Sequence, residues 1–127
     1  MPVRGLPPYD DNNIFARILR GEIPCNKVYE DHWTLAFYDI NPQAPQHVLV
    51  IPKSRYCSFA DFSASAPQKE IAGFMRAVGA VAKQLGMETN GYRLIANMGP
   101  DSGQEVQHFH VHLCAGRPLG RMIPLPT

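Results

Sequence analysis

The sequence predicts a single α+β domain with a five-stranded, mostly antiparallel sheet, one long helix and one short helix. Three observations lead to this prediction. The chain has 127 residues, enough for one domain with a substantial core. Five short segments have the apolar pattern of strands, and two others repeat apolar residues at helical spacing. Their order is helix, three strands, helix, two strands, which is typical of an α+β domain.

The overall composition limits the kinds of partner that the chain can take. A net charge of +1 gives no basic surface for a long nucleic acid, although it is compatible with a ligand that carries one or a few phosphates. No segment approaches the roughly 20 apolar residues of a membrane span. The three cysteines are scattered and no signal-peptide pattern precedes them, so we expect reduced thiols and a cytoplasmic protein.

The chain begins with a proline-rich segment, residues 1–12, which we expect to be a flexible leader. The domain then runs over 13–127. Its first element is a short helix over 13–21, capped by an asparagine and ended by Gly21. The apolar residues of this helix repeat at three and four, which predicts one buried face.

Five strands are predicted from short apolar or alternating runs, at 27–30, 33–38, 46–53, 92–97 and 106–114. The third has an unbroken apolar run, which indicates a central strand.

The long helix is predicted between the third and fourth strands. Ser65 and Gln68 have the spacing of a capping box, with Pro67 in the first turn, and Gly86 ends the helix. Its apolar residues from Ile71 onward have helical spacing, so one face should pack on the sheet.

Three of the five histidines occur at alternate positions in the last predicted strand. His108, His110 and His112 alternate with apolar residues, which is the pattern of a strand with one buried face. Their side chains should therefore point together from the other face, about 6.5–7 Å apart.

Such a row has three interpretations. It could be the polar face of a half-exposed strand. It could bind zinc, since two histidines at i and i+2 can share one ion, but the outer pair is widely spaced and no Cys-x-x-Cys or His-Glu-x-x-His pair supports a metal site. It could also hold a histidine nucleophile, because a neutral imidazole is abundant at pH 7 and can attack phosphorus. The sequence favours the third, and we expect neither metal nor cofactor.

The segment His108-Phe109-His110-Val111-His112-Leu113 resembles the signature of the histidine triad (HIT) family of nucleotide hydrolases and transferases. The flanking residues 103–106 and 115–120 resemble the HINT-like branch, and the resemblance covers about 13–120. It implies a HIT-like fold and a homodimer in which two sheets join. It also implies hydrolysis of purine nucleoside phosphoramidates and aminoacyl adenylates through a nucleotidyl-histidine, releasing the nucleoside monophosphate.

The resemblance assigns roles to four histidines. His110, the middle one of the signature, would be the nucleophile, and His112 would bind phosphate. His108 would support the row, and His47 would hold a triad imidazole in its working orientation.

The resemblance also implies a purine nucleotide site. Asp39 would bind the ribose hydroxyls and Ile40 would lie beside the base. Phe15, Ile23 and Phe37 would contribute to the walls of the base pocket. From its position alone, however, Asp39 is better interpreted as a residue that caps a turn.

Residues before the triad would surround the α-phosphate. The resemblance places Asn97, Gly103, Gln104, Glu105 and Val106 there. Glu105 stands where some members of the family have serine, and a carboxylate there would repel a phosphate unless its side chain turned away. This difference bears on substrate preference.

The last segment, about 115–127, is rich in proline and glycine, and the resemblance implies that it reaches a dimer partner. Three other functions remain open from the sequence. The chain could be a nucleotide-binding adaptor with little turnover, a hydrolase of dinucleoside polyphosphates, or a zinc-binding module.

Overall fold

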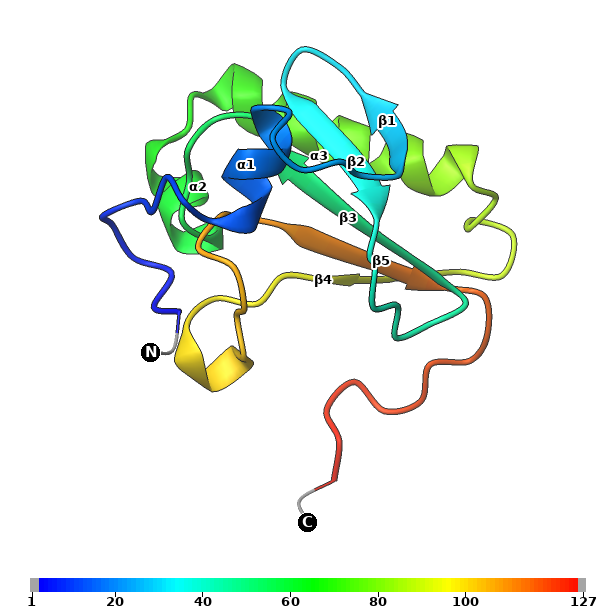
Figure 1. Ribbon diagram of the computed structural model, residues 1–127. Coiled ribbons are helices and arrows are strands. Elements are labelled where there is room, and N and C mark those ends of the chain that lie inside the picture. Colours follow the sequence, from blue (N-terminus) through cyan, green and yellow to red (C-terminus); the bar gives the residue numbers. More distant parts are fainter. Residues whose placement is uncertain (1–2, 126–127) are drawn as a thin grey trace.

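The computed structural model describes residues 3–125 and contains one five-stranded sheet (Figure 1). The strands are β1 (Lys27–Glu30), β2 (Thr34–Tyr38), β3 (Gln46–Pro52), β4 (Arg93–Ile95) and β5 (Val111–Ala115). Their order is β1-β2-β3-β5-β4, and each neighbouring pair is antiparallel. The predicted α+β class and antiparallel sheet are confirmed.

The helices are α1 (Ile14–Leu19), α2 (Phe59–Ser65) and α3 (Gln68–Gln84), with a 3₁₀ turn, η1, over Pro100–Ser102. The Asn13 side chain caps α1, accepting from the Ala16 N–H at 2.9 Å, as predicted. The predicted capping box of the long helix is wrong, because Ser65 ends a separate short helix and Pro67 is the N-cap of α3. Ala66 has an extended backbone, as the residue before a proline tends to have, and this separates helix α2 from helix α3.

The two faces of the sheet are covered differently (Figure 1). Helices α2 and α3 cover one face with the larger core, in which the Phe62, Phe74 and Phe109 rings pack together. Helix α1 covers only part of the opposite face, where Phe15 packs edge-on against Phe37. The partly covered face leaves room for a ligand.

Strand β5 begins at Val111, not at residue 106 as predicted. The Phe109 N–H donates to the Tyr56 carbonyl at 2.7 Å, a bond to a loop and not to a neighbouring strand. His108 and His110 therefore precede the strand, and His112 lies within it. The apolar alternation is correct nonetheless, since Phe109, Val111 and Leu113 are all buried in the larger core.

The two ends of the described chain behave differently. Leader residues pack against the body: Gly5 donates its N–H to Gln107 at 3.0 Å and accepts from the Ser58 hydroxyl at 2.6 Å. The C-terminal segment leaves the sheet (Figure 1), and the Arg93 guanidinium donates to the Gly120 carbonyl at 2.7 Å. Residues 1–2 of the predicted leader and 126–127 of the predicted tail lie outside the described residues. No helix between residues 3 and 125 is long and apolar enough to cross a membrane.

Candidate active site

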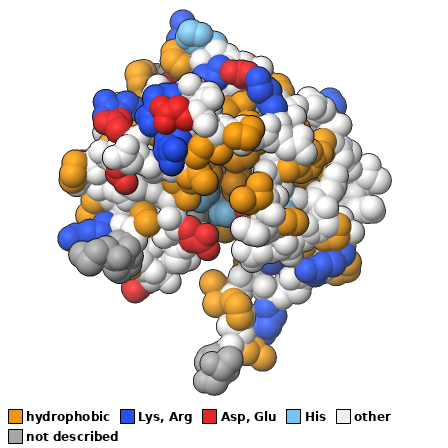
Figure 2. All heavy atoms as spheres, viewed as in Figure 1, with side chains coloured by type: hydrophobic (Ala, Val, Ile, Leu, Met, Phe, Trp, Pro, Cys, Tyr) orange, Lys and Arg blue, Asp and Glu red, His pale blue; other side chains and the backbone are white. Residues whose placement is uncertain are grey.

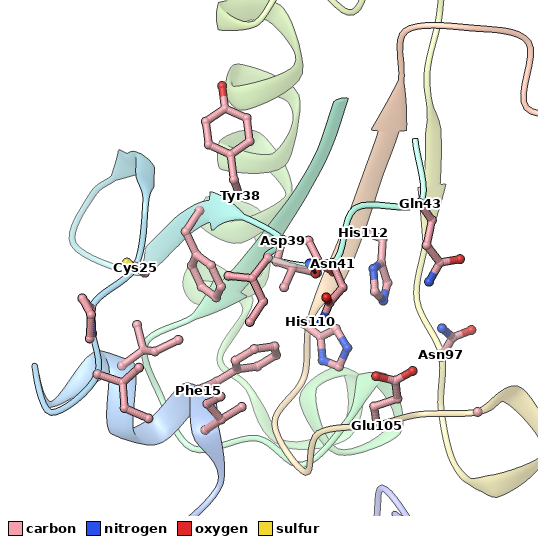
Figure 3. Close-up of a pocket in the computed structure, with 18 residues that line it drawn as sticks. Phe15, Cys25, Tyr38, Asp39, Asn41, Gln43, Asn97, Glu105, His110 and His112 are labelled. Carbon is pink, nitrogen blue, oxygen red and sulfur yellow. Dashed lines mark hydrogen bonds between the residues drawn. The ribbon is translucent and has the colours of Figure 1, made fainter. Parts of the chain in front are cut away.

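A cavity of about 430 Å³ lies on the face that α1 partly covers. Figure 2 shows histidine atoms in a hollow between hydrophobic side chains, with an acidic side chain near its rim. The cavity has an apolar end near α1 and a polar end beside His110 and His112, as the side chains in Figure 3 show. An apolar end that passes into a polar end suits a ligand that is itself half aromatic and half charged.

Most of the predicted site residues line this cavity. The ones that do are Phe15, Ile23, Phe37, Asp39, Ile40, Asn97, Gly103, Glu105, His110 and His112. Four others are not among the lining residues: His47, His108, Gln104 and Val106. Of these four, His47, His108 and Gln104 are buried, and each forms hydrogen bonds that position its neighbours.

The Ile23-Pro24 turn lines the cavity, as the resemblance implied. Sequence reasoning did not single out several other lining residues: Ile14, Ile18, Cys25, Tyr38, Asn41, Gln43 and Leu49. The helical spacing of Ile14 and Ile18 with Phe15 was the available signal, but the same spacing equally predicts a core-facing stripe. Both residues belong to a helix whose apolar face borders the cavity.

The His110 ring is fixed by a hydrogen bond at one of its two nitrogens. Its Nδ1 lies 2.7 Å from the main-chain carbonyl of His108, and the Phe15 ring packs edge-on against it at 5.0 Å between centroids. A carbonyl can only accept, so Nδ1 carries the proton and Nε2 retains its lone pair. Burial also lowers the pKa of His110, which favours the neutral, nucleophilic imidazole.

A chain of hydrogen bonds determines the tautomer of His112. The Gln43 N–H donates to His47 Nδ1 at 3.0 Å, so the proton of His47 is on Nε2. This Nε2 lies 2.9 Å from His112 Nδ1 and 3.4 Å from Asp39 Oδ2. His112 Nδ1 is thus an acceptor, and its Nε2–H remains as a donor in the polar part of the cavity.

The same hydrogen bonds disfavour a metal ion bound between Asp39, His47 and His112. Asp39, His47 and His112 offer ligand atoms within 4.8 Å of one another, which is compatible with a shared ion. A metal on His47 Nε2 would displace its proton while the Gln43 N–H still occupies Nδ1, so the ring would have to become an imidazolate. Coordination would therefore require the loop at Gln43 to rearrange.

His108 is fully buried and bonded at both nitrogens. Nε2 donates to the Pro52 carbonyl at 2.8 Å, and Nδ1 accepts from the Tyr9 hydroxyl at 2.5 Å. Arg55 lies over the Tyr9 ring at 5.1 Å and pairs with Asp11 at 2.8 Å. The leader, through Tyr9, thus contacts His108, and the His108 carbonyl accepts the hydrogen bond that orients the His110 ring.

We expect Tyr9→Phe to lower the free energy of unfolding by about 1–2 kcal/mol, because it leaves the buried His108 Nδ1 without its donor. Urea unfolding measures the change. Tyr92→Phe is the matched control, since Tyr92 is exposed and should change stability by less than about 0.5 kcal/mol. Equal losses in the two variants would show that the Tyr9 hydroxyl contributes nothing specific.

Stability should fall in mild acid because His108 is buried in its neutral form. Burial lowers the pKa of His108 from about 6.5 to about 4. Between these values the unfolded chain binds the extra proton, so the stabilisation is complete above about pH 6.5 and is lost towards pH 4. We expect about 2 kcal/mol less stability at pH 5 than at pH 7 from this residue. Urea midpoints that are equal at the two pH values would contradict the expectation.

Glu105 does not turn away from the cavity. Its side chain lines the polar end, and Figure 3 shows the carboxylate directed towards the space beside His110 and Asn97. Asp39 lies on the side of His47, with its Oδ2 3.4 Å from His47 Nε2, and its Oδ1 accepts from the Asn41 N–H at 2.8 Å. The polar end thus contains two carboxylates with different surroundings.

Comparison with known proteins gives a consistent result. The HIT domain family model matches residues 20–119. An uncharacterised 13.2 kDa HIT-like protein of Azospirillum brasilense is 61% identical over 115 residues, covering 91% of this chain and 94% of its own. The purine nucleoside phosphoramidase of Escherichia coli K12 is 46% identical over 114 residues, covering 89% and 94%. A HIT family hydrolase structure from Clostridium thermocellum superposes with a TM-score of 0.79 at 36% identity, covering 91% and 99%.

Proposed function

The chain belongs to the HIT domain family, and we propose that it hydrolyses purine nucleoside 5′-phosphoramidates and aminoacyl adenylates. The general class, a hydrolase of this family, has support from the relatives named as hydrolases. The choice of the P–N or acyl-phosphate bond is the proposal. The observation that carries it is the His110 ring, whose Nδ1 is tied to the His108 carbonyl while Nε2 keeps its lone pair beside the cavity.

In this proposal the purine base occupies the apolar end, against Phe15, Ile23 and Phe37. Asp39 binds the ribose hydroxyls, with Ile40 beside the base. The α-phosphate then falls at the polar end, within reach of the triad. A nucleotide in this orientation matches the apolar-to-polar order of the cavity.

The reaction would proceed in two displacements at phosphorus. His110 Nε2 attacks in line, the P–N bond breaks, and the amine leaves with a proton taken from solvent, which the attacking water returns in the second step. Water then attacks phosphorus, the Nε2–P bond breaks, and the nucleoside monophosphate is released. His112 Nε2–H, the Asn97 amide and main-chain N–H groups around Gly103 would balance the charge that develops on the phosphate oxygens.

A steady-state assay with a tryptamine-type adenosine phosphoramidate tests the proposal. We expect multiple turnovers and release of AMP. A very low rate alongside tight AMP binding would instead support an adaptor. Faster cleavage of diadenosine tri- or tetraphosphate would support the polyphosphate hydrolase. Stoichiometric zinc in the purified protein, with activity lost to a chelator, would support the zinc-binding module.

We also propose that the protein forms a homodimer and acts in the cytoplasm. Strand β4 is at an edge of the sheet and Leu94 on it is about half exposed, which suits an edge that joins a second sheet. Light scattering on the purified protein gives the mass that decides this. All three cysteines are free thiols, as expected in a reducing compartment.

A further inference from the structure

Among the residues that the structure describes, the lining of the cavity includes acidic side chains and no lysine or arginine. Asp39 and Glu105 are its carboxylates, and its two histidines are His110 and His112. Burial lowers the pKa of both histidines, so the rings are neutral at pH 7. A phosphate therefore meets hydrogen-bond donors in this cavity without a fixed positive charge to compensate its own.

The two carboxylates differ in what they contact. Asp39 accepts from the Asn41 N–H and lies 3.4 Å from His47 Nε2. Glu105 has no hydrogen bond or ion pair to any residue within the described range 3–125. The carboxylate that faces the polar end beside His110 is thus unpaired, and it can take a partner from a ligand (Figure 3).

The position of Glu105 points to one part of the substrate. His110 is buried at the floor of the cavity, whereas Glu105 is exposed at its edge. With the base in the apolar end and the ribose beside Asp39, the departing group leaves from the polar end to reach solvent. Glu105 and Gly103 are exposed residues of the lining at this end, so a group that leaves on the Glu105 side passes close to the carboxylate.

We propose that Glu105 selects leaving groups that carry a positive charge, so that the preferred substrates are nucleoside phosphoramidates of diamines or of amines with a second cationic group. This rests on the proposed phosphoramidate hydrolysis and deepens it. An ammonium group beyond the scissile nitrogen pairs with the Glu105 carboxylate and offsets the repulsion between that carboxylate and the phosphate. A neutral leaving group leaves the repulsion in place, and an anionic one increases it.

Three adenosine phosphoramidates of equal chain length test the inference. Their leaving groups are propane-1,3-diamine (cationic), propylamine (neutral) and β-alanine (anionic). We expect the wild-type kcat/KM to fall in that order, with the cationic substrate about fivefold above the neutral one, as for an exposed ion pair. In Glu105→Gln the ratio should fall below twofold, and 0.5 M salt should reduce it in the wild type.

Glu88→Gln is the matched control, because Glu88 is exposed and outside the cavity, and it makes the same change in net charge. It should retain the wild-type preference. A wild-type ratio below twofold, or a ratio unchanged in Glu105→Gln, would overturn the inference. Equal losses for all three substrates in that variant would also overturn it, since they would indicate a general role in proton transfer.

Failure of the proposed function has a different signature. Absence of turnover with all three compounds would count against the phosphoramidase itself. Calorimetric binding of the same compounds would still decide the inference, since the cationic compound should bind several-fold more tightly than the neutral one to wild type and not to Glu105→Gln.

Discussion

We expect His110→Ala to bind AMP with nearly unchanged affinity and to lose turnover by about four orders of magnitude or more. The imidazole is proposed to form the covalent bond to phosphorus, so its removal abolishes the two-step route. The apolar end, Asp39 and the donors around Gly103 are untouched, so most of the binding surface persists. Phosphoramidate hydrolysis and calorimetry with AMP provide the two measurements.

His32→Ala is the matched control for this variant. His32 is exposed beside Trp33, outside the cavity, and its loss should leave kcat within about twofold of the wild type. Intact-mass measurement after a rapid quench should show a nucleotide adduct on wild type and none on His110→Ala. Near-normal hydrolysis by the folded variant would remove His110 from the nucleophile's role.

The spacing of apolar residues in the sequence correctly predicted the elements that are held in place mainly by burying those residues. The unbroken apolar run of β3 indicated a central strand, and β3 indeed pairs with both β2 and β5. The alternation of Phe109, Val111 and Leu113 likewise predicted which side chains enter the core. The same alternation made the predicted strand too long at its start. An extended segment can bury alternate side chains without hydrogen-bonding to a neighbouring strand.

Long-range contacts set the parts of the candidate site that the sequence did not predict. The tautomer of His112 depends on the Gln43 N–H, and the free nitrogen of His110 depends on the His108 carbonyl. Tyr9 lies in a proline-rich leader that predicts no element, yet its hydroxyl bonds His108 across 99 positions of sequence. No local pattern encodes such a pairing, which follows from how the leader packs on the folded chain.

Gln104 shows most clearly a structural contact that the sequence did not predict. The resemblance placed the main chain of residues 103–106 around the phosphate, and the Gln104 side chain is buried and bonds the loop to itself and to the body. Its Oε1 accepts from the Gly99 N–H at 2.9 Å, and its Nε2 donates to the Cys57 and Val106 carbonyls at 2.8 and 2.9 Å. Through these bonds the amide fixes both ends of the turn that presents Gly103 and Glu105 to the cavity.

We therefore expect Gln104→Ala to lower the free energy of unfolding by about 3 kcal/mol, because three main-chain groups lose their partner and a buried amide leaves a cavity. Urea unfolding at pH 7 measures the loss. Gln84→Ala is the matched control, since the exposed Gln84 amide makes a single bond, to the Val28 carbonyl, and its loss should cost less than about 1 kcal/mol. In Gln104→Ala the KM for a phosphoramidate should also rise, because the turn that carries Gly103 and Glu105 is no longer held at both ends. A loss no larger than that of Gln84→Ala would mean that the turn keeps its shape without the Gln104 amide.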